Sequence, residues 1–443
     1  MPLSRSERSL ALASICAAAL IFLPGVPRET EVSLPRMEIW EGPLLVFTGN
    51  EKGFIRPCGC SKPALGGIHR RATFLDSLRK EHTFHLLSVG DLVVEGGRQQ
   101  RMKFESFLMA MSVMGYQALG LSMGELKLGV SYLKEMRAFA SFPILSLNLY
   151  EGDERIFAPE VTLPDSHFRV TALLPESTLP IDGAVIRPPL SELTAWWSSL
   201  PPTDVPIVLW GGTETELTTL LASFRPADGR GWFVFGGNAD QPVRLKGETQ
   251  ARAFSVGSKG RFVALLRPEE ESFLKDVRLE ESIKFHEDVN PILEAYRASL
   301  GEENLLAAVP RKSGGPEYVG DQSCRECHQE IFDALASSSH KRAWATLVET
   351  NDHHDPECVS CHVTGFGTEF GFQSLEKNKH LVDVTCESCH GPGELHVQTQ
   401  APMPVARPDP KFCMTCHDAD NSPHFKYETY WPKIAHGKPE SGK

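Results

Sequence analysis

Four short segments in the last third of the chain combine two thiols with an imidazole at one fixed spacing. They read CRECH at 324–328, CVSCH at 358–362, CESCH at 386–390 and CMTCH at 413–417. Two cysteines three positions apart reach the two vinyl groups of one porphyrin, and the adjoining histidine ligates the iron, so Cys-x-x-Cys-His is the attachment pattern of c-type haem. We therefore expect four c-type haems. The predicted attachment residues are Cys324, Cys327, Cys358, Cys361, Cys386, Cys389, Cys413 and Cys416. The predicted proximal ligands of the iron are His328, His362, His390 and His417.

The alternative interpretation of these segments is a pair of zinc sites built from Cys-x-x-Cys knuckles. Zinc knuckles need no histidine after each pair of cysteines, and the whole chain of 443 residues holds only 16 histidines. Four coincident histidines therefore favour haem over zinc.

The region that carries these segments also has a surplus of histidines. It holds eleven, and seven remain after the four proximal ligands. The remaining histidines are His340, His353, His354, His380, His396, His424 and His436. Such a surplus predicts that most irons take a second imidazole, which favours low reduction potentials and closes the iron to substrates.

The residues between the haem segments carry a family resemblance. The string YVGDQSCRECHQEIFDALASSSHKRAWATL, followed by CVSCHVTGFG, VTCESCHGPGELH and KFCMTCHDADNSPHFKYETYWPKIAHG, resembles the tetrahaem cytochromes of the five-five-four type, which carry electrons in nitrifiers. The resemblance implies that His340, His396 and His436 are distal iron ligands. His424, His353 and His354 compete for a fourth place, and members of the family can leave one haem five-coordinate.

The first 30 residues predict export. Arg5 and Arg8 precede a largely apolar run from Leu10 to Leu23, which is the layout of an export signal, although no clear small-residue cleavage site follows. Residues 1–30 are therefore either a removed signal or a retained N-terminal anchor, and we expect a periplasmic or cell-surface protein. The formal net charge of −12 argues against a nucleic-acid partner.

Between residues 40 and 267 the sequence predicts an α/β domain. Apolar runs typical of strands lie at 43–48, 84–90, 143–149, 205–211, 232–237 and 261–266. Segments with apolar residues at helical spacing lie at 70–80, 104–115 and 214–224. Residues 268–317 predict a helical linker. Residues 318–443 show little apolar periodicity, so we expect a mostly helical and irregular domain in which the haems supply much of the interior.

The α/β domain also resembles metallophosphoesterases of the 5′-nucleotidase type. LLVFTGNEKG, LLSVGDLVVEGG and GYQALGLSMGELKLG follow the order of that family's metal-binding segments. Most of the metal ligands are replaced, since Asn50 and Lys52 stand at the first Asp and His positions and Met123 and Gly124 at the Asn-His pair. One clear aspartate, Asp91, cannot hold two cations, so we expect the fold without phosphatase activity.

The stretch IRPCGCSKPALGGIHRRA at 55–72 contains Cys58 and Cys60, a close pair in a region otherwise free of cysteine. Three interpretations remain open. The pair is a structural element, a redox-active dithiol, or a thiolate site for a metal completed by His69. The nearby cations, among them Arg56 and Arg71, would lower the pKa of the thiols.

The sequence as a whole favours an exported electron carrier with four, mostly bis-histidine haems and redox proteins as partners. In this interpretation the protein contacts a membrane only through a retained N-terminal anchor. The haems would exchange electrons with the Cys-Gly-Cys site, or the α/β domain would serve as a docking platform. The alternative is a haem oxidoreductase that acts on a small nitrogen or sulfur compound at a five-coordinate iron.

Overall fold

The protein was examined as a computed structural model, which describes residues 44–57, 62–177, 181–224, 226, 229–245, 252–268 and 274–436. The expected export segment and the pair Cys58 and Cys60 lie outside these ranges. Within them, no helix is both long and apolar enough to cross a membrane.

The N-terminal region is built on two main sheets. The first has the strand order β14-β13-β1-β2-β3-β4, in which β1 to β4 run parallel and β13 and β14 are antiparallel additions at one side. Its strands are β1 (Leu44–Thr48), β2 (Phe84–Ser88), β3 (Ala118–Gly120), β4 (Ile144–Leu145), β13 (Phe262–Leu266) and β14 (Leu274–Arg278). Every residue of β1 is buried, as expected for a central strand that is covered on both faces.

The second sheet has the order β12-β11-β10-β8-β7, and only β7 runs antiparallel. Its strands are β7 (Glu160–Thr162), β8 (Phe168–Leu173), β10 (Val205–Trp210), β11 (Trp232–Phe235) and β12 (Arg252–Ser255). A small third sheet contains β5 (Leu149–Glu151), β6 (Glu154–Arg155) and β9 (Val185–Ile186).

The two main sheets face each other, and helices cover their outer sides. One core cluster joins side chains of both sheets, such as Phe47 of the first and Phe254 of the second, whose ring centres are 5.4 Å apart. A second cluster lies between the first sheet and α2 (Ile68–Glu81), α3 (Arg98–Met114) and α8 (Asn290–Glu302). A third lies between the second sheet and α6 (Pro189–Ser199) and α7 (Glu214–Ser223).

The short α4 (Met123–Leu126) and α5 (Val130–Phe139) follow β3. These layers confirm the predicted α/β class.

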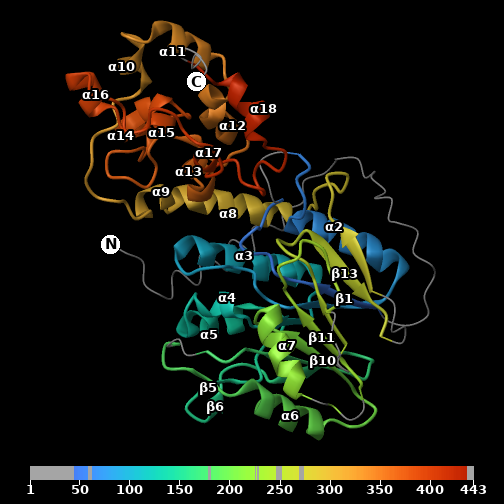
Figure 1. Ribbon diagram of the computed structural model, residues 1–443. Coiled ribbons are helices and arrows are strands. Elements are labelled where there is room, and N and C mark those ends of the chain that lie inside the picture. The colour runs from blue at the N-terminus through green and yellow to red at the C-terminus, as the bar shows by residue number, and fades with distance from the viewer. Residues whose placement is uncertain are drawn as a thin grey trace.

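Two segments expected in the linker join this region instead. Residues 274–278 form the edge strand β14, which pairs with β13. Helix α8 packs on α3, and its Leu293, Tyr296 and Leu300 belong to the core cluster beneath the first sheet. In Figure 1, α8 lies between the strands and the orange and red helices of the C-terminal region.

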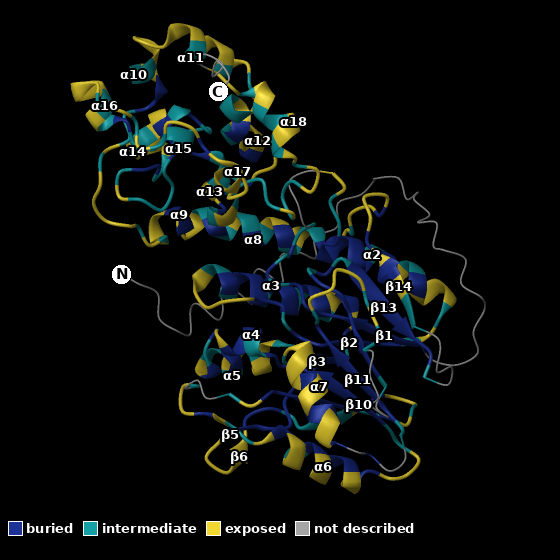
Figure 2. Cartoon of the chain, viewed as in Figure 1, coloured by how far each residue is buried: buried dark blue, intermediate teal, exposed yellow. Residues whose placement is uncertain are grey.

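The C-terminal region consists of short helices and loops, as expected. Its helices are α9 (Leu305–Ala308), α10 (Asp321–Arg325), α11 (Gln329–Ala336), η1 (Ser339–Arg342), α12 (Ala343–Glu349), α13 (Pro356–His362), α14 (Leu375–Asn378), η2 (Lys379–Leu381), α15 (Cys386–His390), α16 (Glu394–Thr399), α17 (Pro410–Cys413), α18 (Tyr427–Tyr430) and η3 (Trp431–Lys433). Figure 2 shows that this region is mostly exposed or half-buried, in contrast to the dark interior of the α/β region.

Candidate multihaem site

Short helical turns present the four Cys-x-x-Cys-His segments. The turn places two cysteines three residues apart on one side, with the histidine one residue beyond, because residues three and four apart are neighbours on a helix. In the first segment His328 N–H donates to the carbonyl of Cys324 at 2.9 Å, and in the fourth His417 N–H donates to that of Cys413 at 2.9 Å. The second and fourth turns begin with an aspartate cap and a proline, as α13 and α17 show.

Three of the four predicted proximal histidines face a second imidazole. The ring centres of His328 and His396 are 6.1 Å apart, those of His340 and His417 are 6.1 Å apart, and those of His390 and His436 are 5.7 Å apart. Two metal–nitrogen bonds of about 2 Å, with half a ring on each side, separate two ring centres by roughly 6 Å. The three pairs therefore fit an iron between them.

The other nitrogen of these rings is held by the backbone. The Nδ1–H groups of His390, His396 and His436 donate to carbonyl oxygens at 2.7, 2.6 and 2.9 Å. His362 Nδ1–H donates in the same way to the carbonyl of Ala343 at 2.6 Å. This contact fixes the tautomer in which Nε2 carries the free lone pair, as an iron ligand requires.

His362 has no facing imidazole in the described part of the chain. His353 and His354, two candidates for the fourth distal place, contact each other with ring centres 4.2 Å apart, and His353 also contacts Trp344. His354 lies beside Gly301 of α8. His424 and His380 are exposed. The geometry therefore brings three distal candidates to proximal histidines and leaves His362 with an open side.

The cysteines place the four segments in a spatial order that differs from their order in the chain. The thiols of Cys324 and Cys386 form a hydrogen bond with each other, which joins the first and third segments. Burial first, and then the charges of Cys413 and Cys386, raises the pKa of Cys389 to about 11, so the third segment adjoins the fourth.

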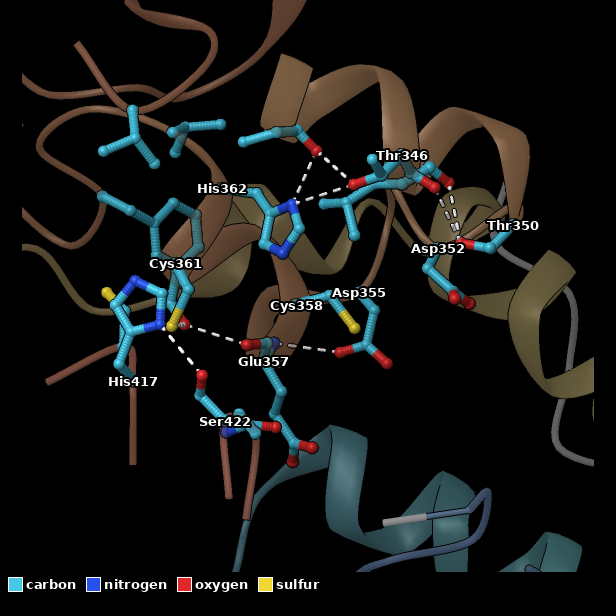
Figure 3. Close-up of a pocket in the computed structure, with 18 of the residues that line it drawn as sticks. Thr346, Thr350, Asp352, Asp355, Glu357, Cys358, Cys361, His362, His417 and Ser422 are labelled. Atoms are coloured by element: carbon cyan, nitrogen blue, oxygen red, sulfur yellow. Dashed lines mark hydrogen bonds between the residues drawn. The ribbon is translucent and has the colours of Figure 1, made fainter. Parts of the chain in front are cut away.

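The fourth segment in turn adjoins the second, since the thiols of Cys361 and Cys416 form a hydrogen bond with each other. The four segments are therefore arranged as first, third, fourth and second. In Figure 3 the second and fourth segments lie together, with the His362 and His417 rings and the sulfur atoms of Cys358 and Cys361 gathered in one cavity.

This cavity has a volume of about 2430 Å³ and is lined by residues of both regions. Small-molecule pockets typically measure about 300–1,000 Å³, so this space exceeds the need of one such ligand. Its lining includes five of the predicted attachment cysteines, the histidines His340, His362 and His417, several aromatic rings and residues of α8. Together with the histidine pairs, its size fits the predicted haems.

Cations of the α/β region meet acids of the C-terminal region beside the second segment. Arg56 binds Asp352 and also contacts Asp355 Oδ2 at 3.4 Å and Cys358 Sγ at 3.5 Å. Lys103 Nζ lies 2.6 Å from both carboxylate oxygens of Glu357. The second segment is thus the one whose attachment cysteine touches the α/β region.

A second ionic contact joins the fourth segment to the same region. Asp420 follows the fourth segment and binds Lys259, and its Oδ1 lies 3.1 Å from Arg261. Both contacts have the same polarity, with the cation on the α/β side and the acid on the haem side. The α/β region therefore adjoins the second and fourth segments, at one end of the spatial order.

The positions at which the sequence resemblance places metal ligands are filled by internal contacts. Lys52 Nζ binds Asp91 Oδ2 at 2.8 Å, and Asn50 Nδ2 donates to the carbonyls of Gly237 and Gly257 at 2.7 Å. Within the described ranges, no group of three or more histidine, cysteine, aspartate or glutamate side chains is arranged to hold a metal. An ammonium group therefore stands beside the aspartate where a cation would bind.

Glu125, also at this position, is completely buried. Its carboxylate accepts from Leu92 N–H at 2.6 Å and from Asp91 N–H at 3.1 Å. Burial first, and then the charge of Asp91, raises the pKa of Glu125 to about 7. Both carboxylate oxygens of Glu125 accept hydrogen bonds from backbone N–H groups, so this side chain has a structural role.

Three of the cations near Cys58 and Cys60 in the sequence have partners among the described residues. Arg71 is buried against Glu51, with Nη2 2.6 Å from Oε1, and Arg70 donates to the carbonyl of Ala64 at 2.5 Å. Arg56 reaches the C-terminal region, a contact that no local pattern in the sequence predicts. His69 is buried and lines the large cavity.

Three imidazole pairs, each with one ring on a Cys-x-x-Cys-His turn and one pair lining the large cavity, are the pattern of a multihaem c-type cytochrome region. Residues 323–391 match the model of the family described as cytochrome c554 and c-prime. This match confirms the resemblance found in the sequence of this region.

Two cytochromes are similar to this chain. A C-type polyheme cytochrome, OmcB of Geobacter sulfurreducens, is 28% identical over 142 residues, which cover 32% of this chain and 15% of OmcB. Cytochrome c-554 of Nitrosomonas europaea is 32% identical over 91 residues, which cover 17% of this chain and 39% of that cytochrome. The chain thus matches less than half of either relative.

Among solved structures, the 5′-nucleotidase precursor of Thermus thermophilus is similar, with a TM-score of 0.49 and 18% identity. The match covers 63% of this chain and 62% of that protein.

Proposed function

We propose that the protein is an exported c-type cytochrome that carries electrons through four covalently bound haems. The observation that carries the proposal is the set of three imidazole pairs with ring centres 5.7–6.1 Å apart. In this proposal His396, His340 and His436 are the distal ligands opposite His328, His417 and His390. Low-potential haems with two histidine ligands suit electron transfer rather than substrate chemistry.

The contacts between cysteines support a path for the electrons. The first haem would exchange with the third, the third with the fourth, and the fourth with the second, because the attachment residues adjoin in that order. The second haem then lies beside the α/β region, and the first lies at the far end. Redox proteins would dock at the first haem, where Cys327 and His328 are exposed.

The α/β region would serve this path as a platform rather than as a phosphatase. Cys58 directly follows Pro57, which lines the cavity beside the second segment. This proximity in sequence supports exchange of electrons between a Cys58/Cys60 site and the second haem. We assign residues 1–30 to export or anchoring and residues 318–443 to the haem-binding domain.

A second function is favoured by one observation, the open side of His362. A five-coordinate iron there would allow the protein to act as an oxidoreductase on a small nitrogen or sulfur compound. The electron path would then supply or remove electrons at that iron.

The first test is the EPR spectrum of the fully oxidised, haem-loaded protein, integrated against total haem. We expect four haems per chain, with about a quarter of them high-spin, because one of four irons has a single imidazole. Replacing His396 with alanine should raise the high-spin fraction to about one half. The matched control His424→Ala should leave it unchanged. Fewer than four haems per chain, or no change in the His396 variant, would contradict the proposal.

A further inference from the structure

The cavity beside the second haem segment is a joint product of the two regions. Arg56 and His69 come from the α/β region, Tyr296 from α8, and Cys358 and His362 from the C-terminal region, and all five line it. A haem attached at the second segment would therefore have the α/β region as part of its surroundings. The cytochrome family model matches residues 323–391, which lie outside the α/β region that supplies this wall.

Arg56 is the cation of that wall that lies nearest to the attachment residues. Its side chain is held by Asp352 and Asp355 and lies 3.5 Å from Cys358 Sγ. A guanidinium carries five N–H donors, and these contacts leave some of them for a further acceptor. The surrounding acids balance the cations, so a ligand here would be recognised by directed donors more than by net charge.

His69 is a buried polar group in the same cavity. Only 2% of it is exposed, and its Nδ1 has no hydrogen bond to any residue that the structure describes. Its ring centre lies 4.6 Å from that of Phe285. An unpaired buried ring nitrogen costs free energy that a bound hydrogen-bonding partner would recover.

We infer that Arg56 and His69 form a binding site for a small anion that ligates the open iron at His362. Both side chains offer N–H groups, so the ligand they fit is a hydrogen-bond acceptor with an atom that can bind iron. Azide and nitrite have this chemistry. The inference rests on the proposed haem at Cys358, Cys361 and His362, and it adds that the α/β region supplies the ligand's polar contacts.

Azide is the probe for the test, used with the full-length, haem-loaded, oxidised protein. We expect azide to convert the high-spin signal to low-spin, with a dissociation constant measured by optical titration. Arg56→Gln and His69→Phe should each weaken azide binding by about 10-fold, the loss of one hydrogen bond to a charged group. The matched controls Arg155→Gln and His167→Phe remove the same groups far from the cavity and should leave the constant unchanged.

The outcomes separate this inference from the proposed function. Four haems that are all low-spin, or azide affinities within twofold of the parent in both variants, would overturn the anion site and leave the electron carrier standing. Fewer than four haems in the parent protein would overturn the proposed function itself. If the Arg56→Gln variant does not load haem, the Arg56→Lys variant is tested in its place. A loss of azide affinity in a fully loaded Arg56→Lys variant supports the inference.

Discussion

The α/β region fills three core clusters with its own side chains, which include large buried rings such as Trp210, Trp232 and Phe104. The described part of the C-terminal region has one small cluster of six buried residues, and seven of its helices bury none. The cluster consists of Leu306, Leu347, Val359, Val363, Phe372 and Leu381. The helices without buried residues are α11, η1, α14, α16, α17, α18 and η3.

The difference shows that the two regions obtain their interiors from different sources. Apolar burial is the main driving force for folding, and six residues supply little of it. The large cavity and the paired imidazoles supply the places where haems would add apolar surface and iron bonds. The α/β region needs no such addition, because its strands are covered on both faces.

Production of the protein without haem should have the largest effect on the difference between the two regions. In protein produced without haem attachment, we expect the C-terminal region to lose its structure and the α/β region to keep it. Limited proteolysis should then cut readily after about residue 310 and leave a resistant N-terminal fragment. A C-terminal region that resists protease without haem would contradict the view that cofactors form its core.

Removing one haem from the middle of the path tests the spatial order. Cys386→Ser with Cys389→Ser should remove the third haem and cut electron transfer between the first haem and the other two, although the third segment is not the middle in the chain. Stopped-flow reduction should show only part of the haem absorbance changing quickly. Reduction of all remaining haems at the parent rate would contradict this order.

The counterpart of the Cys386 and Cys389 variant is the double variant Cys58→Ser with Cys60→Ser in the α/β region. We expect four haems per chain, because these cysteines lie outside the haem segments, and a changed rate of electron exchange with a redox partner. Haem content is measured by absorbance against protein mass. An unchanged rate of electron exchange in a variant that carries four haems would contradict electron transfer between the two regions.

A buried ion pair should control the stability of the α/β region alone. Arg71→Leu leaves the Glu51 carboxylate buried without its partner, so we expect a loss of about 3–5 kcal/mol in the free energy of unfolding. Urea unfolding followed by tryptophan fluorescence measures it. The exposed pair Lys134 and Glu151 is the control, where Lys134→Ala should cost about 1 kcal/mol or less. Equal losses in the two variants would contradict the role of burial.

The smallest expected effect is a pH dependence. The pKa of Glu125 is raised to about 7 in the folded protein by burial and by Asp91, which itself binds Lys52. Because the folded state holds this proton more tightly than the unfolded state, its contribution to stability is full below the unfolded pKa near 4.5 and is lost as pH rises through about 7. We expect the α/β region to lose up to a few kcal/mol over this range. Glu125→Gln should flatten the dependence, and an unchanged slope would assign it to other groups.

Some strands were predicted from the sequence and others were not. The expected strands at 43–48, 205–211 and 232–237 are present as β1, β10 and β11, because an unbroken apolar run between turn residues defines a buried strand locally. The short β3 and the edge strand β14 were not predicted. Their sequences carry weak local signals, and only pairing with neighbouring strands makes them part of a sheet.

The sequence by itself determined the chemistry of the C-terminal region, because covalent haem attachment needs only local spacing within five residues. It also determined the α/β class, since apolar runs encode strands. Only the tertiary structure decided which imidazoles face each other, that the haem segments adjoin in the order first, third, fourth and second, and that Arg56 reaches Cys358. These contacts join residues up to 302 positions apart, and no local pattern records a partner at that distance in the chain.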